Sequence, residues 1–316
     1  MVGRVAVNLG AVMAARLRIE GRLRRTPILR APMETVNGSV EVAFKLEYLQ
    51  LGGSFKARGS LNAVLAARES GLLSSAGVVV ASGGNAAIGA AWAARLVGAS
   101  CTVVVPVTAP QVKVDTLRAL GADVHLVGDR YAQAAEAAHA MADDRGALRL
   151  HAYDLPDIVA GAGTIGLEIA DDLDGPVTTV ACVGGGGLLA GLTASLRPDD
   201  RLIGVEPVGA SCLHQALAAG RPVPTELDSV AADSLGATQV GDICWELVSG
   251  NRKVSSVIVP DDDIVAARAQ LWRDHRILVE HGTASSVAAI MTGQVRPQAD
   301  STLCVVLCGA NTTLGP

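Results

Sequence analysis

The chain has 316 residues, half of them hydrophobic, and a formal net charge of −5 at pH 7. A chain of this length can bury the core of one large α/β domain or of two smaller ones. Its lysines and arginines are scattered, which excludes the concentrated basic surface that binds a phosphate backbone, so we expect no nucleic-acid partner.

The N-terminal segment 5–15 is apolar, but it is predicted to be an amphipathic entry helix rather than a signal peptide. Asn8 interrupts the apolar run, and several arginines follow it directly. No segment reaches the length of a membrane span. The six cysteines lack the close paired spacing of a zinc site or of a small disulfide-bonded protein. We therefore expect a reduced, cytoplasmic protein with no membrane partner.

Lys56 is one of only four lysines, and it lies in the segment Ser54–Gly59, which is mostly small and apolar. A desolvated lysine can lose its proton and attack a carbonyl carbon, whereas an arginine stays protonated. Lys56 is therefore a candidate for imine chemistry. The alternative interpretation is a solvated lysine at the start of a helix.

From residue 78 onward, short runs rich in β-branched residues alternate with alanine-rich stretches of helical length. This pattern is typical of parallel strands joined by crossover helices. Strands are predicted at 78–81, 101–105, 123–127, 178–183, 202–205, 255–259 and 302–307. Helices are predicted at 85–96, 111–120, 131–142, 163–171, 188–196 and 261–276. The alternation favours doubly wound sheets, and it leaves the strand order open.

The segment Ser82, Gly83, Gly84 and Asn85 occupies a junction between a predicted strand and a predicted helix. Its backbone amides can hold an anion such as a substrate carboxylate, and the Asn85 side chain can donate to a phenolate oxygen. The alternative is a serine helix cap followed by a glycine turn.

A second junction contains four successive glycines, namely Gly184, Gly185, Gly186 and Gly187, followed by Leu188. Glycine lets the backbone approach an anion closely at the positive end of a helix dipole. The spacing differs from those of dinucleotide folds and nucleotide P-loops, so a single phosphate fits this junction better. The alternative is a flexible turn between a strand and a helix.

Cys308 directly follows the last predicted strand, so its thiol is expected beyond the carboxyl edge of a sheet. Alone, such a cysteine is usually a small buried hydrophobe. Together with an imine-forming lysine, a phosphate-binding turn and a carboxylate-binding loop, however, it describes a site for pyridoxal 5′-phosphate and an amino acid.

These motifs, in this order, resemble the fold-type-II pyridoxal-phosphate enzymes, in particular the threonine and serine dehydratases (ammonia-lyases). The resemblance runs almost end to end, with further similar segments at 26–29, 160–164, 204–207 and 231–236. It implies an α/β fold like that of the tryptophan synthase β-subunit, with two doubly wound α/β domains. The large pyridoxal-phosphate-binding domain would comprise residues 1–60 and 147–316, and the small α/β domain residues 61–146.

The resemblance also implies a role for each candidate residue. Lys56 would form the imine with the cofactor aldehyde, and Phe55 would pack near the cofactor ring. Asn85 would bind the 3′ oxygen of that ring, and the amides of Gly184–Leu188 would bind the phosphate. Cys308 would face the pyridine nitrogen, where a neutral thiol disfavours protonation of the ring.

An unprotonated ring favours expulsion of a β leaving group over transamination. Lys56 would remove the Cα proton, and the cofactor phosphate, held by amides without Lys or Arg, would act as the acid for the β-hydroxyl. The expected reaction is therefore that of an L-serine/L-threonine dehydratase, which yields a 2-oxo acid and ammonia.

Differences from the family pattern narrow the range of functions expected for this chain. Racemases of this fold carry a hydroxyl residue where this chain has Gly83, and without it reprotonation of the opposite face should be slow. Those racemases also bind a divalent cation through an acidic cluster, but this chain has Ala210, Ser211 and Cys212 there, so we expect no metal site. The chain ends at Pro316, so no C-terminal regulatory domain is expected.

Several alternatives stay open. Within the same fold they are an amino-acid racemase, a β-replacement synthase and a dehydratase for another β-hydroxy amino acid. A non-catalytic pyridoxal-phosphate-binding protein is the alternative of a different class. We expect a homodimer that acts on a small-molecule amino acid.

Overall fold

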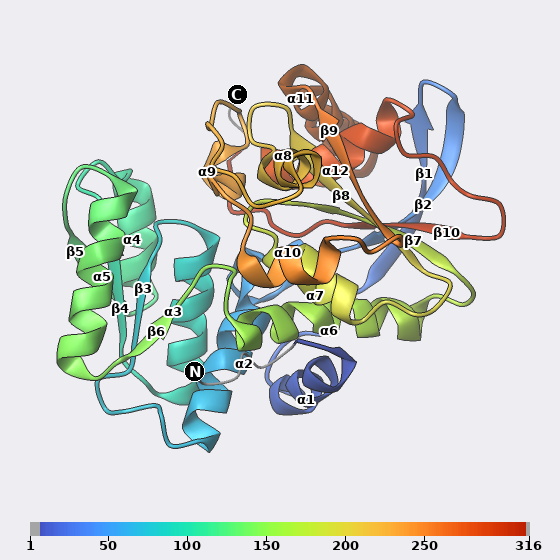
Figure 1. Cartoon of the computed structure of the whole chain (residues 1–316). Coiled ribbons are helices and arrows are strands. Elements are labelled where there is room, and N and C mark those ends of the chain that lie inside the picture. The colour runs from blue at the N-terminus through green and yellow to red at the C-terminus, as the bar shows by residue number, and fades with distance from the viewer. Residues whose placement is uncertain (1–6, 314–316) are drawn as a thin grey trace. The chain divides into compact units, whose positions relative to one another are not determined.

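Residues 7–313 are described by a computed structural model and group into two units (Figure 1). Unit 1 comprises the described residues up to Arg24 together with Gln50–Ala162, and unit 2 comprises Arg25–Leu49 together with the described residues from Gly163 on. The division expected from the sequence, into residues 1–60 with 147–316 and residues 61–146, differs from these units and stays a prediction.

Unit 1 is built around a parallel four-stranded sheet with the strand order β5-β4-β3-β6. Its strands are β3 (Val78–Ala81), β4 (Cys101–Val105), β5 (Asp123–Leu126) and β6 (Leu148–Leu150). Its helices are α1 (Leu9–Ile19), α2 (Lys56–Glu69), α3 (Asn85–Val97), α4 (Gln111–Ala119) and α5 (Tyr131–Arg145), with a 3₁₀ turn at Leu51–Gly53. The long helix α6 (Pro156–Asp172) begins in unit 1 and ends in unit 2.

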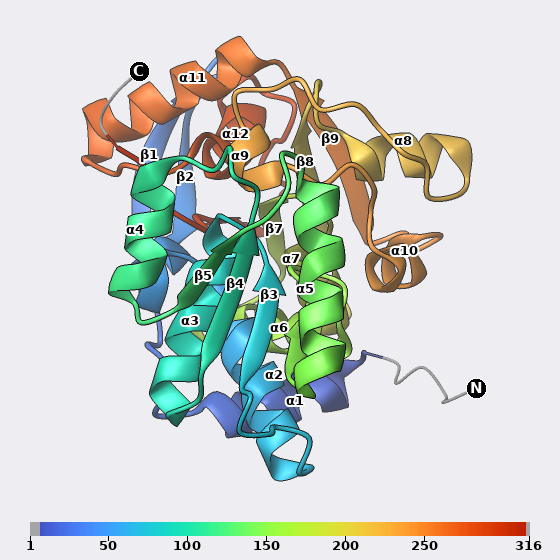
Figure 2. The ribbon, with the colours of Figure 1, turned by 90° about the vertical axis from the view of Figure 1, so that its left-hand side faces the viewer.

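Helices cover both faces of this sheet because side chains alternate along each strand. Val78 and Val80 of β3 pack in one core with residues of α2, α3 and α4. Val79 faces the other way and packs in a second core with Ala134 and Ala138 of α5. Figure 2 shows α4 and α5 on opposite sides of the strands. The predicted doubly wound arrangement is therefore confirmed for unit 1.

Unit 2 contains a six-stranded sheet with the order β1-β2-β10-β7-β8-β9. Its strands are β1 (Ile28–Thr35), β2 (Gly38–Lys45), β7 (Val177–Cys182), β8 (Arg201–Pro207), β9 (Val254–Val259) and β10 (Thr302–Val306). The pair β1–β2 is an antiparallel hairpin, and all other neighbours are parallel.

The helices of unit 2 again lie on both faces of its sheet (Figure 1). They are α7 (Gly187–Ala194), α8 (Cys212–Ala219), α9 (Ala232–Leu235), α10 (Asp242–Val248), α11 (Asp261–Gln270) and α12 (His281–Met291), with a 3₁₀ turn at Glu47–Leu49 and a π-helical turn at Leu271–His275. Phe44 of β2 lies in a core with residues of α11 and α12. Its neighbour Lys45 faces the other way, where its Nζ donates to Glu168 of α6 over 2.6 Å.

The predicted strands at 78–81 and 101–105 match β3 and β4 residue for residue, and the other predicted strands end within two residues of their observed limits. The predicted helix 163–171 begins earlier, at Pro156. Gly161 made this start hard to predict, but the packing of α6 on α2 requires a glycine there. A Cβ at Gly161 would lie 2.6 Å from the carbonyl oxygen of Arg58 in α2. The helix predicted at 261–276 ends as an α-helix at Gln270 and continues as the π-helical turn.

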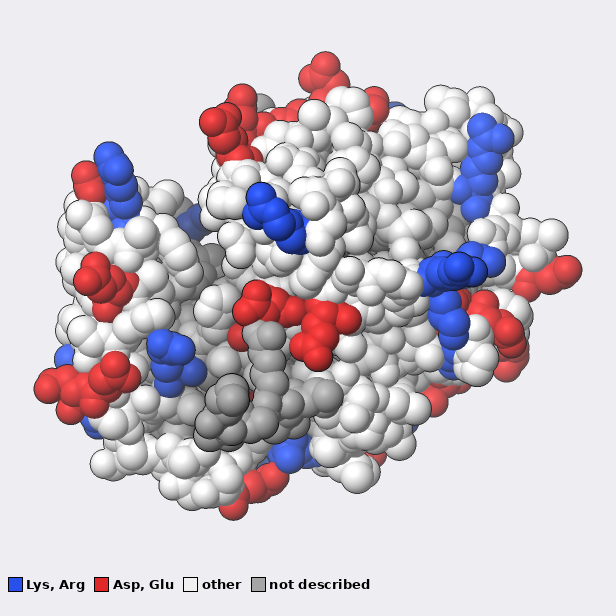
Figure 3. Space-filling model, viewed as in Figure 1, with Lys and Arg blue, Asp and Glu red and all other residues white. Residues whose placement is uncertain are grey.

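Among residues 7–313, no helix has both the length and the apolar character needed to cross a membrane. The predicted entry helix 5–15 is observed as α1 from Leu9 on, and its first two residues lie outside the described part of the chain. On the face shown in Figure 3, lysines and arginines occur singly or in small groups among acidic and uncharged residues.

Candidate functional site

Lys56 is the first residue of α2, and its ammonium group is held inside unit 1. Its Nζ donates to the carbonyl oxygen of Ala152 over 2.8 Å and lies 4.9 Å from the centroid of the Phe55 ring. The side chain is half-buried. Helix α3 packs closely on the Lys56 backbone, because a Cβ at Gly89 would lie 2.9 Å from the Lys56 carbonyl carbon. The alternative of a fully solvated lysine does not describe this environment.

The loop Ser82–Gly84 joins β3 to α3, and Asn85 is the first residue of that helix. Ser82 Oγ accepts a hydrogen bond from the amide of Gly84 over 3.2 Å. Asn85 precedes Gly89 by about one helical turn, so the loop and Lys56 are brought to the same region of unit 1. At Gly83 a Cβ would meet only Val105 Cγ1 at 3.6 Å, an ordinary contact, so packing does not require glycine there.

The segment His151–Asp154, which follows β6, was missed by the sequence reasoning. His151 Nδ1 accepts hydrogen bonds from the amides of Tyr153 (3.3 Å) and Asp154 (2.9 Å). Its ring packs edge-on against the Tyr153 ring, with centroids 4.6 Å apart. Burial lowers the pKa of His151, with Asp154 opposing this effect and Lys56 adding to it. The available signal was its place at the carboxyl end of a parallel strand, where α/β proteins bind ligands.

The four-glycine turn of unit 2 lies between β7 and the N-terminus of α7, as predicted. Gly186 has a φ of +90°, a conformation that favours glycine, and a Cβ there would lie only 2.4 Å from Cys244 Sγ. Gly185 O accepts from the amide of Gly241 over 3.0 Å. Residues of α10 and of the segment before it therefore fix the path of this turn, which ends in the free amides of a helix N-terminus.

A second set of contacts holds the start of the turn. The thiol of Cys212 donates to the carbonyl oxygen of Gly184 over 3.2 Å. Cys212 begins α8, and the buried carboxylate of Glu206 accepts from the amides of Leu213 and His214 over 2.8 Å each. Burial raises the pKa of Glu206 to about 7, although these amides favour its ionised form.

Cys308 follows β10, and its buried thiol lies in a small polar network within unit 2. Its Sγ is 3.2 Å from Thr283 Oγ1 and 3.3 Å from the Sγ of Cys182, the last residue of β7. Because Cys182 is two residues before Gly184, unit 2 brings Cys308 to the start of the four-glycine turn. Cys182 was also missed, since nothing in its sequence context predicts a contact with residue 308.

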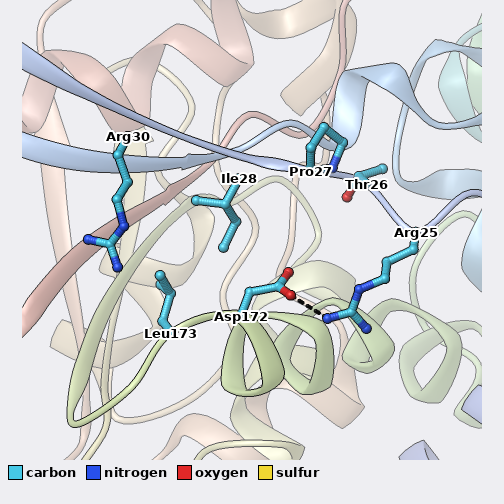
Figure 4. A pocket seen from close by; sticks show the side chains of 7 residues that line it. All are labelled: Arg25, Thr26, Pro27, Ile28, Arg30, Asp172 and Leu173. Carbon is cyan, nitrogen blue, oxygen red and sulfur yellow. Dashed lines mark hydrogen bonds and ion pairs between the residues drawn. The ribbon is translucent and has the colours of Figure 1, made fainter.

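A cavity of about 360 Å³ also lies in unit 2, and none of the predicted site residues lines it (Figure 4). Arg25 and Asp172 form an ion pair within it, and Asp172 Oδ2 is 3.7 Å from the buried Lys45 Nζ. Because its charges are paired internally, we assign it no ligand. Among the residues that the structure describes, no group of three or more His, Cys, Asp or Glu side chains is placed to hold a metal ion.

Each unit thus offers groups that match part of pyridoxal 5′-phosphate. Unit 1 presents the amine of Lys56 beside an aromatic ring, together with the amide-rich loop at Ser82–Gly84. Unit 2 presents an amide-lined turn suited to a phosphate and, next to it, the weakly polar thiols of Cys182 and Cys308. The chemistry of these donors fits the cofactor.

Comparison with known proteins agrees with this chemistry. The chain is 34% identical over 297 residues to the L-threonine ammonia-lyase of Geobacter sulfurreducens, covering 93% of this chain and 73% of that protein. It is 33% identical over 310 residues to the phenylserine dehydratase of Ralstonia pickettii, covering 96% and 93%. Its structure matches the crystal structure of a pyridoxal 5′-phosphate-dependent aspartate racemase with a TM-score of 0.87 and 31% identity, covering 99% and 98% of the two chains.

The family model for pyridoxal-phosphate-dependent enzymes matches residues 19–309, which is nearly the whole chain. The fold is that of the fold-type-II members, and the cofactor is pyridoxal 5′-phosphate. The chain belongs to the pyridoxal-phosphate-dependent enzyme family.

Proposed function

We propose that this enzyme is a lyase that eliminates the β-hydroxyl of an amino acid such as L-serine or L-threonine, yielding a 2-oxo acid and ammonia. Two relatives that span most of this chain support the proposal, since one is named for threonine and the other for phenylserine. Both amino acids carry a hydroxyl group on the β-carbon, which is the group lost in such an elimination.

We assign the roles as follows. Lys56 Nζ would hold the cofactor through its aldehyde group and, as a free amine, would accept the Cα proton of the substrate. The amides of Ser82–Asn85 bind the substrate carboxylate, and Asn85 also contacts the cofactor oxygen beside the imine. The amides of Gly184–Leu188 bind the phosphate, and Phe55 lines the ring. When bound, the cofactor supplies an electron sink that acidifies the Cα proton.

Cys308 faces the pyridine nitrogen in this proposal. Its thiol contacts the hydroxyl of Thr283 and the thiol of Cys182, neither of which is a carboxylate. A thiol in place of a carboxylate beside the nitrogen would make the cofactor a weaker electron sink, which would favour loss of the β-substituent over transamination.

The choice between a dehydratase and a racemase depends on residue 83, which is a glycine in this chain. A racemase must deliver a proton to the face of Cα opposite Lys56, and this requires a second acid. Residue 83 has room for a side chain, since its nearest contact would be Val105 Cγ1 at 3.6 Å, yet it carries none. The aspartate racemase shares the fold, so the reaction depends on such residues rather than on the architecture.

A substrate panel tests this proposal. The purified holoenzyme is incubated with L-serine, L-threonine, L-phenylserine and L-aspartate, and both the 2-oxo acid and the D-amino acid are quantified. We expect 2-oxo acid from at least one β-hydroxy amino acid and no D-isomer. A D-amino acid without 2-oxo acid would establish a racemase, and stoichiometric cofactor binding without turnover would establish a non-catalytic binding protein.

Two variants sharpen the panel. Lys56→Ala should abolish turnover, and borohydride should fix the cofactor to Lys56 in the wild type but leave this variant unlabelled by mass spectrometry. Gly83→Ser supplies the missing hydroxyl, so we expect it to acquire slow formation of the D-isomer. Gly83→Ala is the matched control because it adds the Cβ without the acid.

We further propose a cytoplasmic homodimer. All six cysteines are free thiols in the structure and all are buried, which suits a reducing compartment. Light scattering on the purified holoenzyme tests the assembly, and a single monomeric mass would contradict it.

A further inference from the structure

The segment His151–Asp154 offers a connection to Lys56 that none of the assigned roles uses. We propose that His151 is a positioning residue for Lys56, because its Nδ1 lone pair orients the peptide group whose carbonyl oxygen holds the lysine ammonium. This inference deepens the proposed function and depends on Lys56 being the residue that binds the cofactor.

The connection passes through one peptide plane. The carbonyl of Ala152, which accepts from Lys56 Nζ at 2.8 Å, and the amide of Tyr153, which donates to His151 Nδ1 at 3.3 Å, belong to the same peptide group. In a trans peptide the C=O and N–H point in opposite directions. An acceptor on the N–H side therefore fixes the direction in which the carbonyl points, and the two hydrogen bonds polarise each other.

A second amide locks the imidazole in place. Asp154 N donates to the same Nδ1 over 2.9 Å, so both contacts require Nδ1 to carry a lone pair. The neutral ring must then bear its proton on Nε2. The edge-on contact with the Tyr153 ring, at an interplanar angle of 80°, restricts rotation of the imidazole. The segment is thus built to keep His151 neutral and in one orientation.

Protonation of His151 would remove this support. A proton on Nδ1 would face two N–H donors, and both hydrogen bonds would be lost. The charged groups around His151 are Asp154, Lys56, Arg149 and His139. Burial and the positive neighbours lower the pKa of His151, whereas Asp154 raises it, so the neutral ring persists at neutral pH and support is lost only in acid.

The test uses two substitutions that place an amide at different ends of the ring. In His151→Asn the side-chain oxygen takes the position of Nδ1 and cannot titrate. In His151→Gln the amide reaches the position of Nε2 and leaves the two backbone amides without their acceptor. The readout is the rate at which apoprotein forms the borohydride-fixable bond between pyridoxal phosphate and Lys56, followed by absorbance and by mass spectrometry.

At pH 8 we expect His151→Asn to lie within about twofold of the wild type and His151→Gln to be about tenfold slower. Of the two hydrogen bonds that Gln loses, only the one from Tyr153 acts on the peptide group that holds Lys56, and about tenfold is the effect of that one bond. In acid, below the ordinary imidazole pKa of 6.5, the wild-type rate should fall relative to that of His151→Asn. The ratio of these two rates isolates His151, because the titrations of Lys56 and of the cofactor cancel. His125→Asn is the control: His125 of β5 contacts Asp123 and is not among the groups that act on His151, so this variant should keep the wild-type rate and its pH dependence.

Equal rates for His151→Asn and His151→Gln, or a wild-type to His151→Asn ratio that is flat from pH 5 to 8, would overturn the inference. If His151→Gln does not fold, the pH dependence of the ratio between the wild-type and His151→Asn rates still tests the inference. Nitrogen-15 NMR of histidine-labelled apoprotein adds a measurement on the wild type, whose His151 Nδ1 should report an unprotonated nitrogen at pH 7. Cofactor fixed at a residue other than Lys56 would instead refute the proposed function, so the two failures are distinguishable.

Discussion

Replacing Gly186 by alanine tests whether the four-glycine turn needs glycine for its shape. The φ of +90° costs an L-residue about 1–2 kcal/mol. The added Cβ would also lie 2.4 Å from the Sγ and 2.6 Å from the Cβ of Cys244, and such overpacking costs about 1–3 kcal/mol. We therefore expect Gly186→Ala to lower the free energy of unfolding by about 3 kcal/mol, a large part of the stability of a typical domain.

Gly220→Ala separates the two contributions. Gly220 ends α8 with a φ of +67°, but a Cβ there would meet no neighbouring heavy atom within 4 Å. This variant should lose only the conformational part, about 1 kcal/mol. Urea unfolding of the apoproteins, followed by circular dichroism, measures both losses. In a Cys244→Ala background the loss from Gly186→Ala should shrink, because the Sγ contact is gone while the Cβ contact remains.

Equal losses for Gly186→Ala and Gly220→Ala would refute this reasoning, because they would show that Cys244 does not restrict the turn. We also expect Gly186→Ala, but not Gly220→Ala, to weaken binding of pyridoxal phosphate, since only the former alters the turn assigned to the phosphate. Fluorescence titration of the apoproteins measures that difference.

Three further substitutions probe the surroundings of the site by urea unfolding. Glu206→Gln should remove a pH dependence of the free energy of unfolding. Folding raises the pKa of Glu206 from 4.5 to about 7, so between these pH values the folded protein binds more protons than the unfolded chain. The wild type should therefore lose about 3 kcal/mol of stability as pH rises through this window. Lys45→Met should cost about 3–5 kcal/mol, because Glu168 loses a buried partner at 2.6 Å. Gly59→Ala should cost about 1–3 kcal/mol, since its Cβ would lie 2.6 Å from the Ile158 carbonyl oxygen.

Each of these has its own control. For Glu206 the control is the difference in the free energy of unfolding between wild type and variant, measured at pH 5 and at pH 8. An equal difference at both pH values would contradict the assigned titration. Adding Glu168→Leu to Lys45→Met should recover part of the lost stability; no recovery would mean that the loss of the Lys45 partner of Glu168 is not the cause. For Gly59 the control is Gly71→Ala, where a Cβ would meet no neighbour within 4 Å but the φ of +72° costs about 1 kcal/mol; a loss at Gly59 no larger than this one would contradict close helix packing.

Much of the fold could be predicted because β-branched residues concentrate in the buried parallel strands. Val78–Ala81 and Cys101–Val105 carry this signal clearly, and both were predicted to the residue. The hairpin β1–β2 was missed, because its exposed strand β1 mixes polar and apolar residues and contains Pro32. The start of α6 was missed because Gly161, which allows α2 to approach, reads as a break in the helix.

The candidate site, like the fold, could be predicted only in part from the sequence. Lys56 and the four-glycine turn are visible in the sequence because their chemistry depends on residue type and local spacing. His151 and Cys182 are not visible in this way. The proposed role of His151 depends on the contact between its neighbour Ala152 and Lys56 Nζ, and that of Cys182 depends on its contact with Cys308 Sγ. Both contacts join residues that are far apart in the sequence. Such contacts depend on strand order, which periodicity does not reveal.

Strand β10 pairs with β2 on one side and with β7 on the other, although it is the last strand of the sheet to be synthesised. Until residues 302–306 leave the ribosome, the hairpin β1–β2 and the ribbon β7–β8–β9 each expose an unpaired edge. The two parts of this sheet therefore join only after β10 has been made, and until then each exposes a strand edge that can pair with another chain. Slower synthesis at low temperature should raise the yield of folded enzyme.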